Sequence, residues 1–324
     1  MSRAGPEPAA APVPGRRGDA VPAARGDAVA TARGDAVPAA RPAGAGDGGF
    51  PYRLVATDLD GTLLRRDESI SHRTRTALRA ATAAGALHIV ATGRSVAWTR
   101  HILRDLGYEG LAVCGQGAQL YHAGEDRLVT SVTLDRALAR AVVERLETAF
   151  GPLGVAANRD GLDGQVVADE RFHTGPGSGF GDEEETAGLW RSQDRAALFA
   201  EPLIKLYLRH PTWDDDALAA AALAEVGDAV GLTVSGEGLV EVLPLGLSKA
   251  TGLSLAARRL GVRAAETIAF GDMPNDLSMF AWAGYAVAMG GAHPEVRAAA
   301  DEVTAGNDAD GIALVLERLL TRGG

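Results

Sequence analysis

The chain has 324 residues, a formal net charge of -10 and a hydrophobic content of 46%. This length exceeds what one compact core usually takes, so we expect more than one domain. The acidic balance argues against a general nucleic-acid binder, because phosphate backbones would be repelled. The single cysteine, Cys114, excludes an intrachain disulfide, and no apolar run has the length of a membrane span or the character of a secretory signal. These features favour a cytoplasmic protein.

Residues 1–49 differ in composition from the rest of the chain. They consist mainly of Ala, Pro, Gly, Arg and Asp, and the unit Arg-Gly-Asp-Ala-Val begins at Arg17, Arg25 and Arg33. Few large apolar groups are available to offset the entropy cost of ordering this segment. We therefore predict a disordered tail, and we interpret the Arg-Gly-Asp triplets as a by-product of the repeat rather than as adhesion ligands.

Short apolar runs that end in polar turns recur after this tail, at residues 54–57, 86–91, 111–114, 267–270 and 285–289. Such runs are typical of strands that are buried on both faces of a parallel sheet. Helical patterns that stop before a glycine lie between them, at residues 74–84, 96–106 and 248–260. This alternation predicts an α/β fold with a doubly wound parallel sheet, which binds ligands at the carboxyl ends of its strands.

A different pattern occupies residues 118–244. It predicts two hairpins, at residues 119–133 and 232–243, and two helices, at residues 135–150 and 214–226. It also predicts a further strand at residues 203–209 and a mobile loop at residues 174–185. This mixture indicates an α+β domain inserted into the first domain. Residues 50–117 and 245–324 would then form the α/β core together.

Two aspartates, Asp58 and Asp60, follow the first apolar run. Side chains two residues apart point the same way if the strand geometry continues, so we expect both carboxylates to converge on one site. Two buried like charges are costly unless a cation neutralises them, which favours a metal. For this pair alone, a turn with two solvated aspartates remains the alternative.

Thr92, Gly93 and Arg94 end the second run, and Lys249 begins a predicted helix. The hydroxyl of Thr92 can donate to a phosphate oxygen, and Gly93 lets the backbone approach closely. A lysine at a helix start opposes the helix dipole unless an anion binds there. Taken singly, these residues also fit an ordinary strand-to-helix turn and a solvated surface lysine.

Asp272, Asn275 and Asp276 lie in the segment Gly-Asp-Met-Pro-Asn-Asp at residues 271–276, after a predicted buried strand. The two aspartates can reach a metal shared with Asp58, and hard oxygen ligands suit Mg²⁺. The alternative is that these residues cap a helix with proline in its first turn. Capping and metal binding are compatible.

Together, the four motifs occur in one order, each at the end of a predicted strand or the start of a helix, and they resemble those of the haloacid-dehalogenase superfamily. From about Tyr52 to Leu320 the chain is most similar to the Cof-type sugar-phosphate phosphatases, which carry an α+β cap domain between the second and third motifs. Further stretches fit this resemblance, at residues 115–118, 241–244, 287–290 and 300–304. Gln116 departs from the family's usual Asn-Gly-Ala and could alter substrate contacts.

The resemblance implies a metal site. Asp58 would be the nucleophile and a Mg²⁺ ligand, and Asp60 would be the general acid and then the base, binding the metal through its backbone carbonyl. Asp272 would be a further ligand, and Asp276 would help to position the metal.

The resemblance also implies a phosphate site. Thr92 and Lys249 would hold the phosphoryl oxygens, with the backbone of Gly93 beside them, and Asn275 would position the phosphate and the attacking water. Arg94 is a candidate substrate contact.

These roles amount to a Mg²⁺-dependent phosphatase that acts on a small phosphorylated metabolite through an aspartyl-phosphate. A phosphosugar mutase of the same superfamily is the alternative, and a non-catalytic regulator that binds a phosphorylated metabolite is a third. Asp60 argues against the superfamily's transport ATPases, which carry Thr at this position, and against its dehalogenases, which lack the second Asp. The residues indicate neither the substrate nor the oligomeric state.

Overall fold

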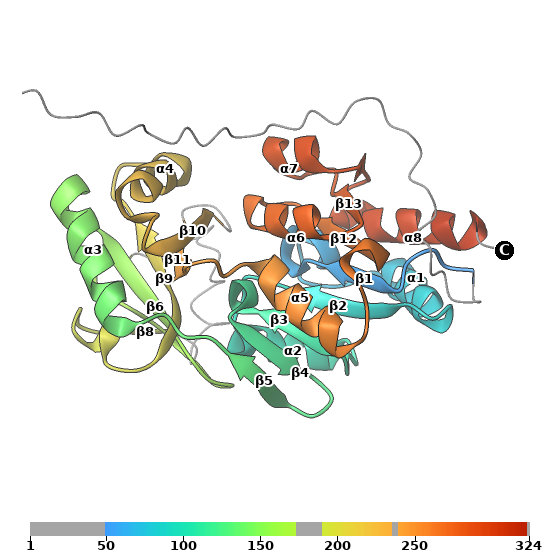
Figure 1. Cartoon of the computed structure of the whole chain (residues 1–324), viewed down its shortest axis with the longest axis horizontal. Coiled ribbons are helices and arrows are strands. Elements are labelled where there is room, and N and C mark those ends of the chain that lie inside the picture. The colour runs from blue at the N-terminus through green and yellow to red at the C-terminus, as the bar shows by residue number, and fades with distance from the viewer. Residues whose placement is uncertain (1–48, 173–189, 235–238, 323–324) are drawn as a thin grey trace, which may run out of the picture. The chain divides into compact units, whose positions relative to one another are not determined.

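The computed structural model describes residues 49–172, 190–234 and 239–322, drawn as coloured ribbon in Figure 1. The predicted tail, apart from Gly49, and the predicted loop at residues 174–185 lie outside the described residues. Among the described helices, none combines the length and the apolar character needed to cross a bilayer.

The larger sheet has eight strands in the order β14-β13-β12-β1-β2-β3-β4-β5. Six of them run parallel, namely β1 (Leu54–Thr57), β2 (Leu87–Ala91), β3 (Leu111–Cys114), β12 (Thr267–Gly271), β13 (Tyr285–Ala288) and β14 (Glu302–Val303). Strand order reverses at β1, which lies between β12 and β2. In an open α/β sheet, a crevice forms at the carboxyl ends of the strands where the order reverses.

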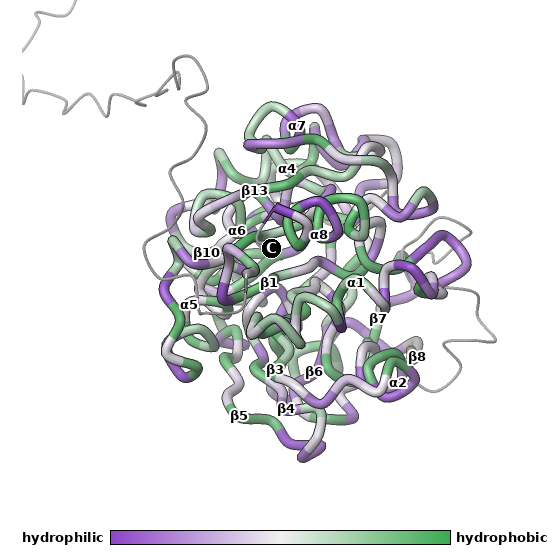
Figure 2. The backbone as a smooth tube through the Cα atoms, turned by 90° about the vertical axis from the view of Figure 1, so that its right-hand side faces the viewer, coloured by the Kyte–Doolittle hydropathy of each residue, from purple (hydrophilic) through white to green (hydrophobic). Residues whose placement is uncertain are grey.

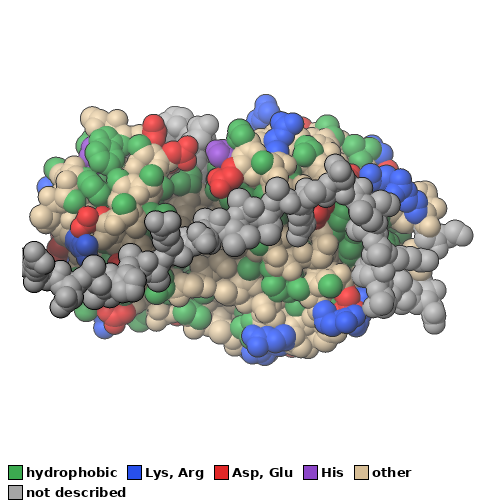
Figure 3. All heavy atoms as spheres, turned by 45° about the horizontal axis from the view of Figure 1, so that its top comes forward, with side chains coloured by type: hydrophobic (Ala, Val, Ile, Leu, Met, Phe, Trp, Pro, Cys, Tyr) green, Lys and Arg blue, Asp and Glu red, His purple; other side chains and the backbone are tan. Residues whose placement is uncertain are grey.

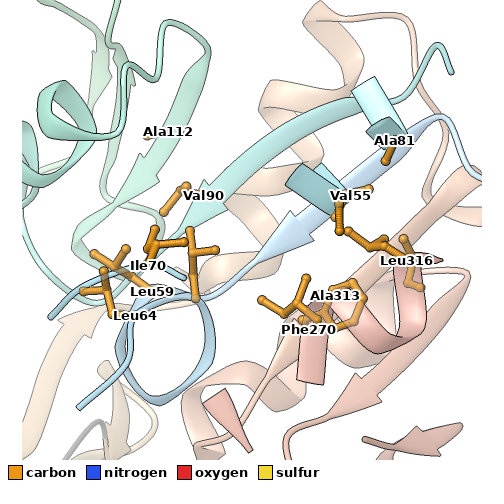
Figure 4. Packing of buried hydrophobic residues seen from close by; sticks show 14 of the residues in the cluster. Val55, Leu59, Leu64, Ile70, Ala81, Val90, Ala112, Phe270, Ala313 and Leu316 are labelled. Carbon is orange, nitrogen blue, oxygen red and sulfur yellow. The ribbon is translucent and has the colours of Figure 1, made fainter. Parts of the chain in front are cut away.

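Helices cover both faces of this sheet. One apolar cluster joins the sheet to α1 (His72–Ala83), α2 (Val96–Asp105) and α8 (Gly311–Arg322), and a second joins it to α5 (Lys249–Arg259), α6 (Leu277–Trp282) and α7 (Pro294–Ala299). Successive side chains of a strand point to opposite faces of the sheet, since Val55 belongs to the first cluster and Leu54 to the second. Figure 4 shows Val55 and Phe270 beside Leu316 of α8. The apolar runs are therefore buried on both sides, as predicted.

The smaller sheet has six strands in the order β10-β11-β9-β6-β7-β8. The strands are β6 (Gly154–Arg159), β7 (Val166–Ala168), β8 (Trp190–Ser192), β9 (Leu203–Arg209), β10 (Val230–Val234) and β11 (Val240–Pro244), all antiparallel to their neighbours except β7 with β8. Its core includes apolar residues of α3 (Arg136–Phe150) and α4 (Asp215–Val226). The two helices, β9 and the β10–β11 hairpin lie where the sequence predicts them, whereas β6 and β7 have no counterpart in that prediction.

Short helical turns complete the architecture, at Leu59–Leu63, Gly115–Gly117, Ala197–Phe199, Ala264–Glu266, Pro274–Asp276 and Asn307–Ala309. Gly115–Gly117 immediately follows β3, and Pro274–Asp276 is separated from the end of β12 by two residues, both at the edge where the predicted site residues lie. In Figure 2, hydrophilic segments are concentrated in the outer turns of the backbone.

The hairpin of β4 (Gln119–His122) and β5 (Arg127–Ser131) lies in a different sheet from the one expected. The sequence pattern predicts an inserted domain over residues 118–244, but β4 pairs antiparallel with β3, with Cys114 opposite Gln119. A strand that returns through a short turn satisfies the edge of its predecessor, and the hairpin pattern does not say which sheet it joins. The larger sheet thus continues to Ser131, beyond the expected boundary.

Candidate active site

The predicted site residues meet at the carboxyl ends of four adjacent strands. Asp58 follows β1, Thr92 follows β2, Gly115 follows β3 and Asp272 follows β12. The ladder continues into these loops, because the amide of Asp58 donates to the carbonyl of Phe270 at 2.9 Å. Sequence positions more than 200 residues apart are therefore held side by side by the order of the strands.

Lys249 reaches into this site from the first position of α5. Its Nζ donates to Oδ1 of Asp58 at 2.6 Å and to Oδ1 of Asp276 at 2.7 Å, and its side chain has no exposed surface. Desolvation on burial lowers the pKa of Lys249, but the carboxylates of Asp276 and Asp58 together outweigh that effect and raise it above the ordinary value. Lys249 is thus a buried cation that ties two of the predicted motifs together, rather than a solvated surface lysine.

Three buried or half-buried carboxylates surround this single ammonium group. Asp58, Asp272 and Asp276 each offer an oxygen, and the three oxygens lie within 4.8 Å of one another. Desolvation raises the pKa of Asp58 well above its usual range; Lys249 lowers it, and the neighbouring carboxylates raise it further. Burial, and then the charge of Asp276, raises the pKa of Asp272 to about 7. The surplus of negative charge on hard oxygen ligands fits a divalent cation such as Mg²⁺.

Asp276 also shapes the loop in which it lies. Its Oδ2 accepts hydrogen bonds from the amides of Asp272 at 2.9 Å and Met273 at 3.1 Å, while its Oδ1 accepts from Lys249. A Cβ atom on Gly271 would lie 2.6 Å from the Asp276 carboxyl carbon, so this close packing requires glycine. The carboxylate of Asp276 therefore fixes both the loop and the lysine.

Thr62 and Gly61 position Asp272 from the loop after β1, and the sequence reasoning did not single them out. The hydroxyl of Thr62 donates to Oδ1 of Asp272 at 2.8 Å. Gly61 has a φ of +68°, and a Cβ atom there would lie 2.2 Å from Oδ2 of Asp272. Their place directly after Asp58 and Asp60 is the signal that could have found them.

Asp60 lies apart from the three carboxylates and pairs with Arg94. The Arg94 guanidinium donates through Nε to Oδ2 of Asp60 at 3.0 Å and through Nη2 to Oδ1 at 2.6 Å. The same Nη2 also donates to Glu68 at 2.6 Å. Arg94, predicted as a substrate contact, is thus occupied by two carboxylates, and the half-exposed Asp60 points toward it.

The loop after β2 is stabilised by a hydrogen bond within it and by the side chain of Gln116 packed against it. Thr92 is fully buried, and its Oγ1 accepts a hydrogen bond from the amide of Arg94 at 3.0 Å. A Cβ atom on Gly93 would lie 2.7 Å from Nε2 of Gln116, whose Oε1 accepts from Nδ2 of Asn275 at 3.3 Å. The residues predicted to hold phosphate thus lie at one edge of the larger sheet, with Thr92 and Gly93 in the loop after β2, Lys249 at the start of α5 and Asn275 in the helical turn Pro274–Asp276.

Lys205 of β9 is a further residue that the sequence reasoning missed. Its Nζ donates to the carbonyl oxygen of Gly93 at 2.8 Å and to Oε1 of Glu241 at 2.6 Å, and both ionic side chains are almost wholly buried. Burial lowers the pKa of Lys205, whereas the Glu241 carboxylate raises it, with a net lowering. A lysine inside the apolar run Leu203–Arg209 was the available signal.

Comparisons with known proteins find similarity to hydrolases and phosphatases. The sequence model of the haloacid dehalogenase-like hydrolase family matches residues 55–316. The chain is 29% identical over 287 residues to the 5-amino-6-(5-phospho-D-ribitylamino)uracil phosphatase of Bacillus subtilis, covering 83% of this chain and 98% of that protein. It is 29% identical over 251 residues to the HMP-PP phosphatase of Serratia proteamaculans, covering 76% and 86%. A solved haloacid dehalogenase-like hydrolase from B. subtilis superposes with a TM-score of 0.70 at 24% identity, covering 82% and 99%.

Proposed function

Because this chain belongs to the haloacid dehalogenase-like hydrolases of the Cof type and is a phosphatase, we propose that it hydrolyses a sugar phosphate or a similar metabolite with Mg²⁺, through an aspartyl-phosphate on Asp58. The observation that carries this proposal is the buried contact of Asp58 with Lys249 at the point where the strand order reverses. A carboxylate oxygen held there can act as a nucleophile toward phosphorus.

In the first half of the reaction, an oxygen of Asp58 forms a bond to phosphorus as the bond from phosphorus to the substrate oxygen breaks. Lys249, Thr92, Asn275 and the backbone of Gly93 hold the phosphoryl oxygens, which need positioning and charge neutralisation more than covalent assistance. Asp60 gives its proton to the departing oxygen. To do so it exchanges its contact with Arg94 for one with the substrate.

In the second half, water attacks the phosphorus of the aspartyl-phosphate, and the bond from phosphorus to the Asp58 oxygen breaks. Asp60, now ionised, takes the proton of this water and is ready for another cycle. Inorganic phosphate and the regenerated Asp58 carboxylate are the products. Arg94, which Glu68 also holds, would then receive and release the Asp60 side chain between the two steps.

Asp58, Asp272 and Asp276, with the backbone carbonyl of Asp60, would hold the magnesium ion. When bound, the cation neutralises charge on the phosphoryl oxygens. Both oxygens of Asp276 already accept hydrogen bonds, so Asp276 contributes chiefly by fixing Lys249 and the loop. The carboxylates of Asp58 and Asp272 are the stronger candidates for direct ligands.

The smaller sheet and its helices, with residues 132–244, would supply the contacts that select the metabolite. We include in this inserted part the segment that begins after β5, because β4 and β5 belong to the larger sheet. Lys205 links the two sheets directly at the loop of Gly93. The relatives' names suggest the first compounds to try, namely 5-amino-6-(5-phospho-D-ribitylamino)uracil and HMP-PP.

Release of inorganic phosphate from these two compounds, and from a panel of sugar phosphates, nucleotides and cofactor phosphates, tests the proposal. We expect turnover with Mg²⁺, none with a chelator and inhibition by Ca²⁺, which prefers more ligands at longer distances. Asp58→Asn is the matched control because it keeps the size of the nucleophile and removes its charge. A wild-type rate no higher than that of Asp58→Asn on the whole panel would contradict the proposal. Isomerised sugar formed with a catalytic amount of a bisphosphorylated sugar would instead indicate a mutase.

A further inference from the structure

Gln116 lies where three loops of the candidate active site meet. Its backbone amide donates to the backbone carbonyl of Thr92 at 3.1 Å, and the backbone amide of Gly115 donates to the backbone carbonyl of Arg94 at 2.8 Å. On its other side, Gly117 packs so closely on the start of α5 that a Cβ atom would lie 2.2 Å from the carbonyl oxygen of Ser248. The backbone of Gln116 is therefore tied to the loop after β2 and packed beside the turn that precedes Lys249.

The backbone conformation of Gln116 is one that glycine adopts more readily. Its φ of +59° and ψ of +24° lie in the left-handed region, which side chains without a local reason rarely occupy. Gln116 is also 99% buried, since only 1% of its surface is exposed. A long polar side chain thus occupies a position where glycine would lower the backbone strain and where burial costs the polar group its hydration.

The side-chain amide of Gln116 is only partly satisfied. Its Oε1 accepts from Asn275 at 3.3 Å, but its Nε2 has no hydrogen-bond partner among the residues that the structure describes. The Oδ1 of Asn275 also lacks a partner within this part of the chain. A buried donor without an acceptor is costly, so native proteins rarely keep one without a ligand, a water or a function.

The unsatisfied donor lies at the predicted phosphate site. Nε2 is so close to Gly93 that a Cβ atom there would come within 2.7 Å, and the amide of Asn275 lies on the same side of Gly93. Thr92, Gly93 and Asn275 are the residues to which we assign phosphoryl contacts. A group rich in acceptors and without donors of its own, such as a phosphoryl group, matches the free amide hydrogens of Gln116.

We propose that Gln116 is a phosphoryl-binding residue whose Nε2 donates a hydrogen bond to an oxygen of the bound phosphoryl group. This inference rests on the proposed function and adds a residue to it. The amide supplies a directional donor without a charge, beside a lysine that supplies the charge. Its contact with Asn275 orients the amide, so that the donor is already in place when the ligand binds.

Two substitutions separate binding from a role in the backbone turn. Gln116→Gly removes the amide and favours the left-handed conformation, so its melting temperature should equal or exceed that of the wild type. Gln116→Glu keeps an acceptor for Asn275 and replaces the donor by an oxygen. Isothermal titration with inorganic phosphate in magnesium buffer should show affinity about 10- to 100-fold weaker for Gln116→Gly, the usual effect of losing a hydrogen bond to a charged group. The Gln116→Glu variant should bind more weakly still, because like charges repel.

Gln119 provides the matched control. It is an equally buried glutamine three residues further on, but its Oε1 accepts from the amide of Val96 and its Nε2 donates to Asp160, both at 3.0 Å. Gln119→Leu should therefore lower the melting temperature and leave phosphate affinity unchanged, the reverse of the pattern for Gln116→Gly.

The outcomes distinguish this inference from the proposed function. Suppose that the wild type hydrolyses phosphomonoesters and that Gln116→Gly binds phosphate as tightly as the wild type. This result would overturn the role of Gln116 and leave the phosphatase proposal intact. A wild type that neither binds phosphate nor releases it from any substrate would overturn both. If Gln116→Gly did not fold, phosphate binding by Gln116→Glu would decide: unchanged affinity would refute the inference.

Discussion

Asp58 and Asp60 are two residues apart, yet their side chains lie in different surroundings. Asp58 is buried against Lys249, whereas Asp60 is half exposed and held by Arg94. The expected alternation of side chains fails here because the backbone leaves strand geometry at residue 59, where a tight turn begins. The difference suits two roles, since a nucleophile needs a fixed position and a group that transfers protons must move.

Asp60→Asn should lower kcat on sugar phosphates about 100- to 10,000-fold, the usual contribution of a general acid or base. Asparagine keeps the size and the backbone carbonyl, so the melting temperature should hardly change. An aryl phosphate, whose leaving group needs little protonation, should be affected less in the first step. Rapid-quench kinetics on both substrates measures this. Asp308→Asn is the control, because Asp308 pairs with Arg66 at the surface at 3.6 Å. Near-normal turnover of a sugar phosphate by Asp60→Asn would remove Asp60 from the mechanism.

Asp272 should make the metal-free protein less stable as the pH rises. Its folded-state pKa is about 7, against an ordinary value of 3.8 in the unfolded chain, because burial and the charge of Asp276 disfavour ionisation. Between these values the folded state binds more protons than the unfolded state, so the free energy of unfolding falls with increasing pH. Asp272→Asn, which keeps an acceptor for Thr62, should therefore melt higher than the wild type at pH 8 in a chelator, and the gap should close toward pH 4.

Added Mg²⁺ should narrow or reverse this gap, since a cation that binds only the folded wild type stabilises it. Thermal unfolding at several pH values, with chelator and with Mg²⁺, measures both effects. A variant that melted lower than the wild type at pH 8 in chelator would show that the Asp272 carboxylate is not repelled by its neighbours.

At the scale of elements, loops and helix starts place the charged groups. Helix α5 begins with a capping box in which Ser248 and Thr251 satisfy each other's backbone amides. A lysine at its first position is unfavourable for the helix dipole, and the carboxylates of Asp58 and Asp276 offset that cost. The cap sets where the helix starts, and the start sets where Lys249 lies.

Gly61→Ala should abolish activity, whereas Gly107→Ala should not. Both glycines have similar positive φ values, +68° and +63°, so both substitutions carry a similar backbone strain of about 1 kcal/mol. Only at Gly61 would the new Cβ meet a side chain, the Asp272 carboxylate, whereas nothing lies within 4 Å at Gly107. Chemical denaturation should show a loss of stability for both variants, larger for Gly61→Ala because of this clash, and phosphate release should be lost only in Gly61→Ala. Equal rates of phosphate release by the two variants would mean that the Asp272 carboxylate can shift without loss of activity.

At the scale of the whole molecule, the two sheets are linked at a functional loop. Lys205 of the smaller sheet donates to the carbonyl of Gly93 at the end of β2 in the larger one, and Glu241 balances its charge. On the face drawn in Figure 3, acidic and basic side chains are scattered among uncharged ones. The buried hydrogen bond from Lys205 to Gly93 can therefore relate substrate selection in the smaller sheet to phosphate binding in the larger one.

Lys205→Met should destabilise the protein by about 3–5 kcal/mol, because it leaves the Glu241 carboxylate buried without its cation. The double variant Lys205→Met/Glu241→Leu should regain most of this stability, as apolar replacements of buried pairs often do. It should still show a KM about tenfold higher, since the loop of Gly93 has lost a charged hydrogen bond.

Denaturant titration and steady-state kinetics measure these two effects. Arg145→Met is the control for an exposed pair, Arg145 with Glu225 at 2.6 Å, and should change stability by no more than about 1 kcal/mol. A double variant with an unchanged KM would show that the Lys205 contact serves folding alone.

Much of the fold follows from local pattern. The apolar runs predict five strands of the larger sheet because continuous burial needs continuous hydrophobicity, and glycines after residues 84, 106 and 260 mark the ends of α1, α2 and α5. Strand β14, with two residues, is too short to leave such a pattern, and β6 contains two alanines and an asparagine. The β4–β5 hairpin was visible in the sequence, but its sheet was not.

The sequence by itself determined that Asp58, Thr92 and Asp272 would lie near one another, because each follows an apolar run and parallel strands end at one edge of their sheet. Only the tertiary structure decided the partners: Lys249 with Asp58 and Asp276, Arg94 with Asp60, Thr62 with Asp272, and Lys205 with Gly93. Hydrophobic period and turn chemistry act over a few residues along the chain. Electrostatic pairing and close packing act through space between segments up to about two hundred residues apart, and they depend on strand order, which local pattern does not contain.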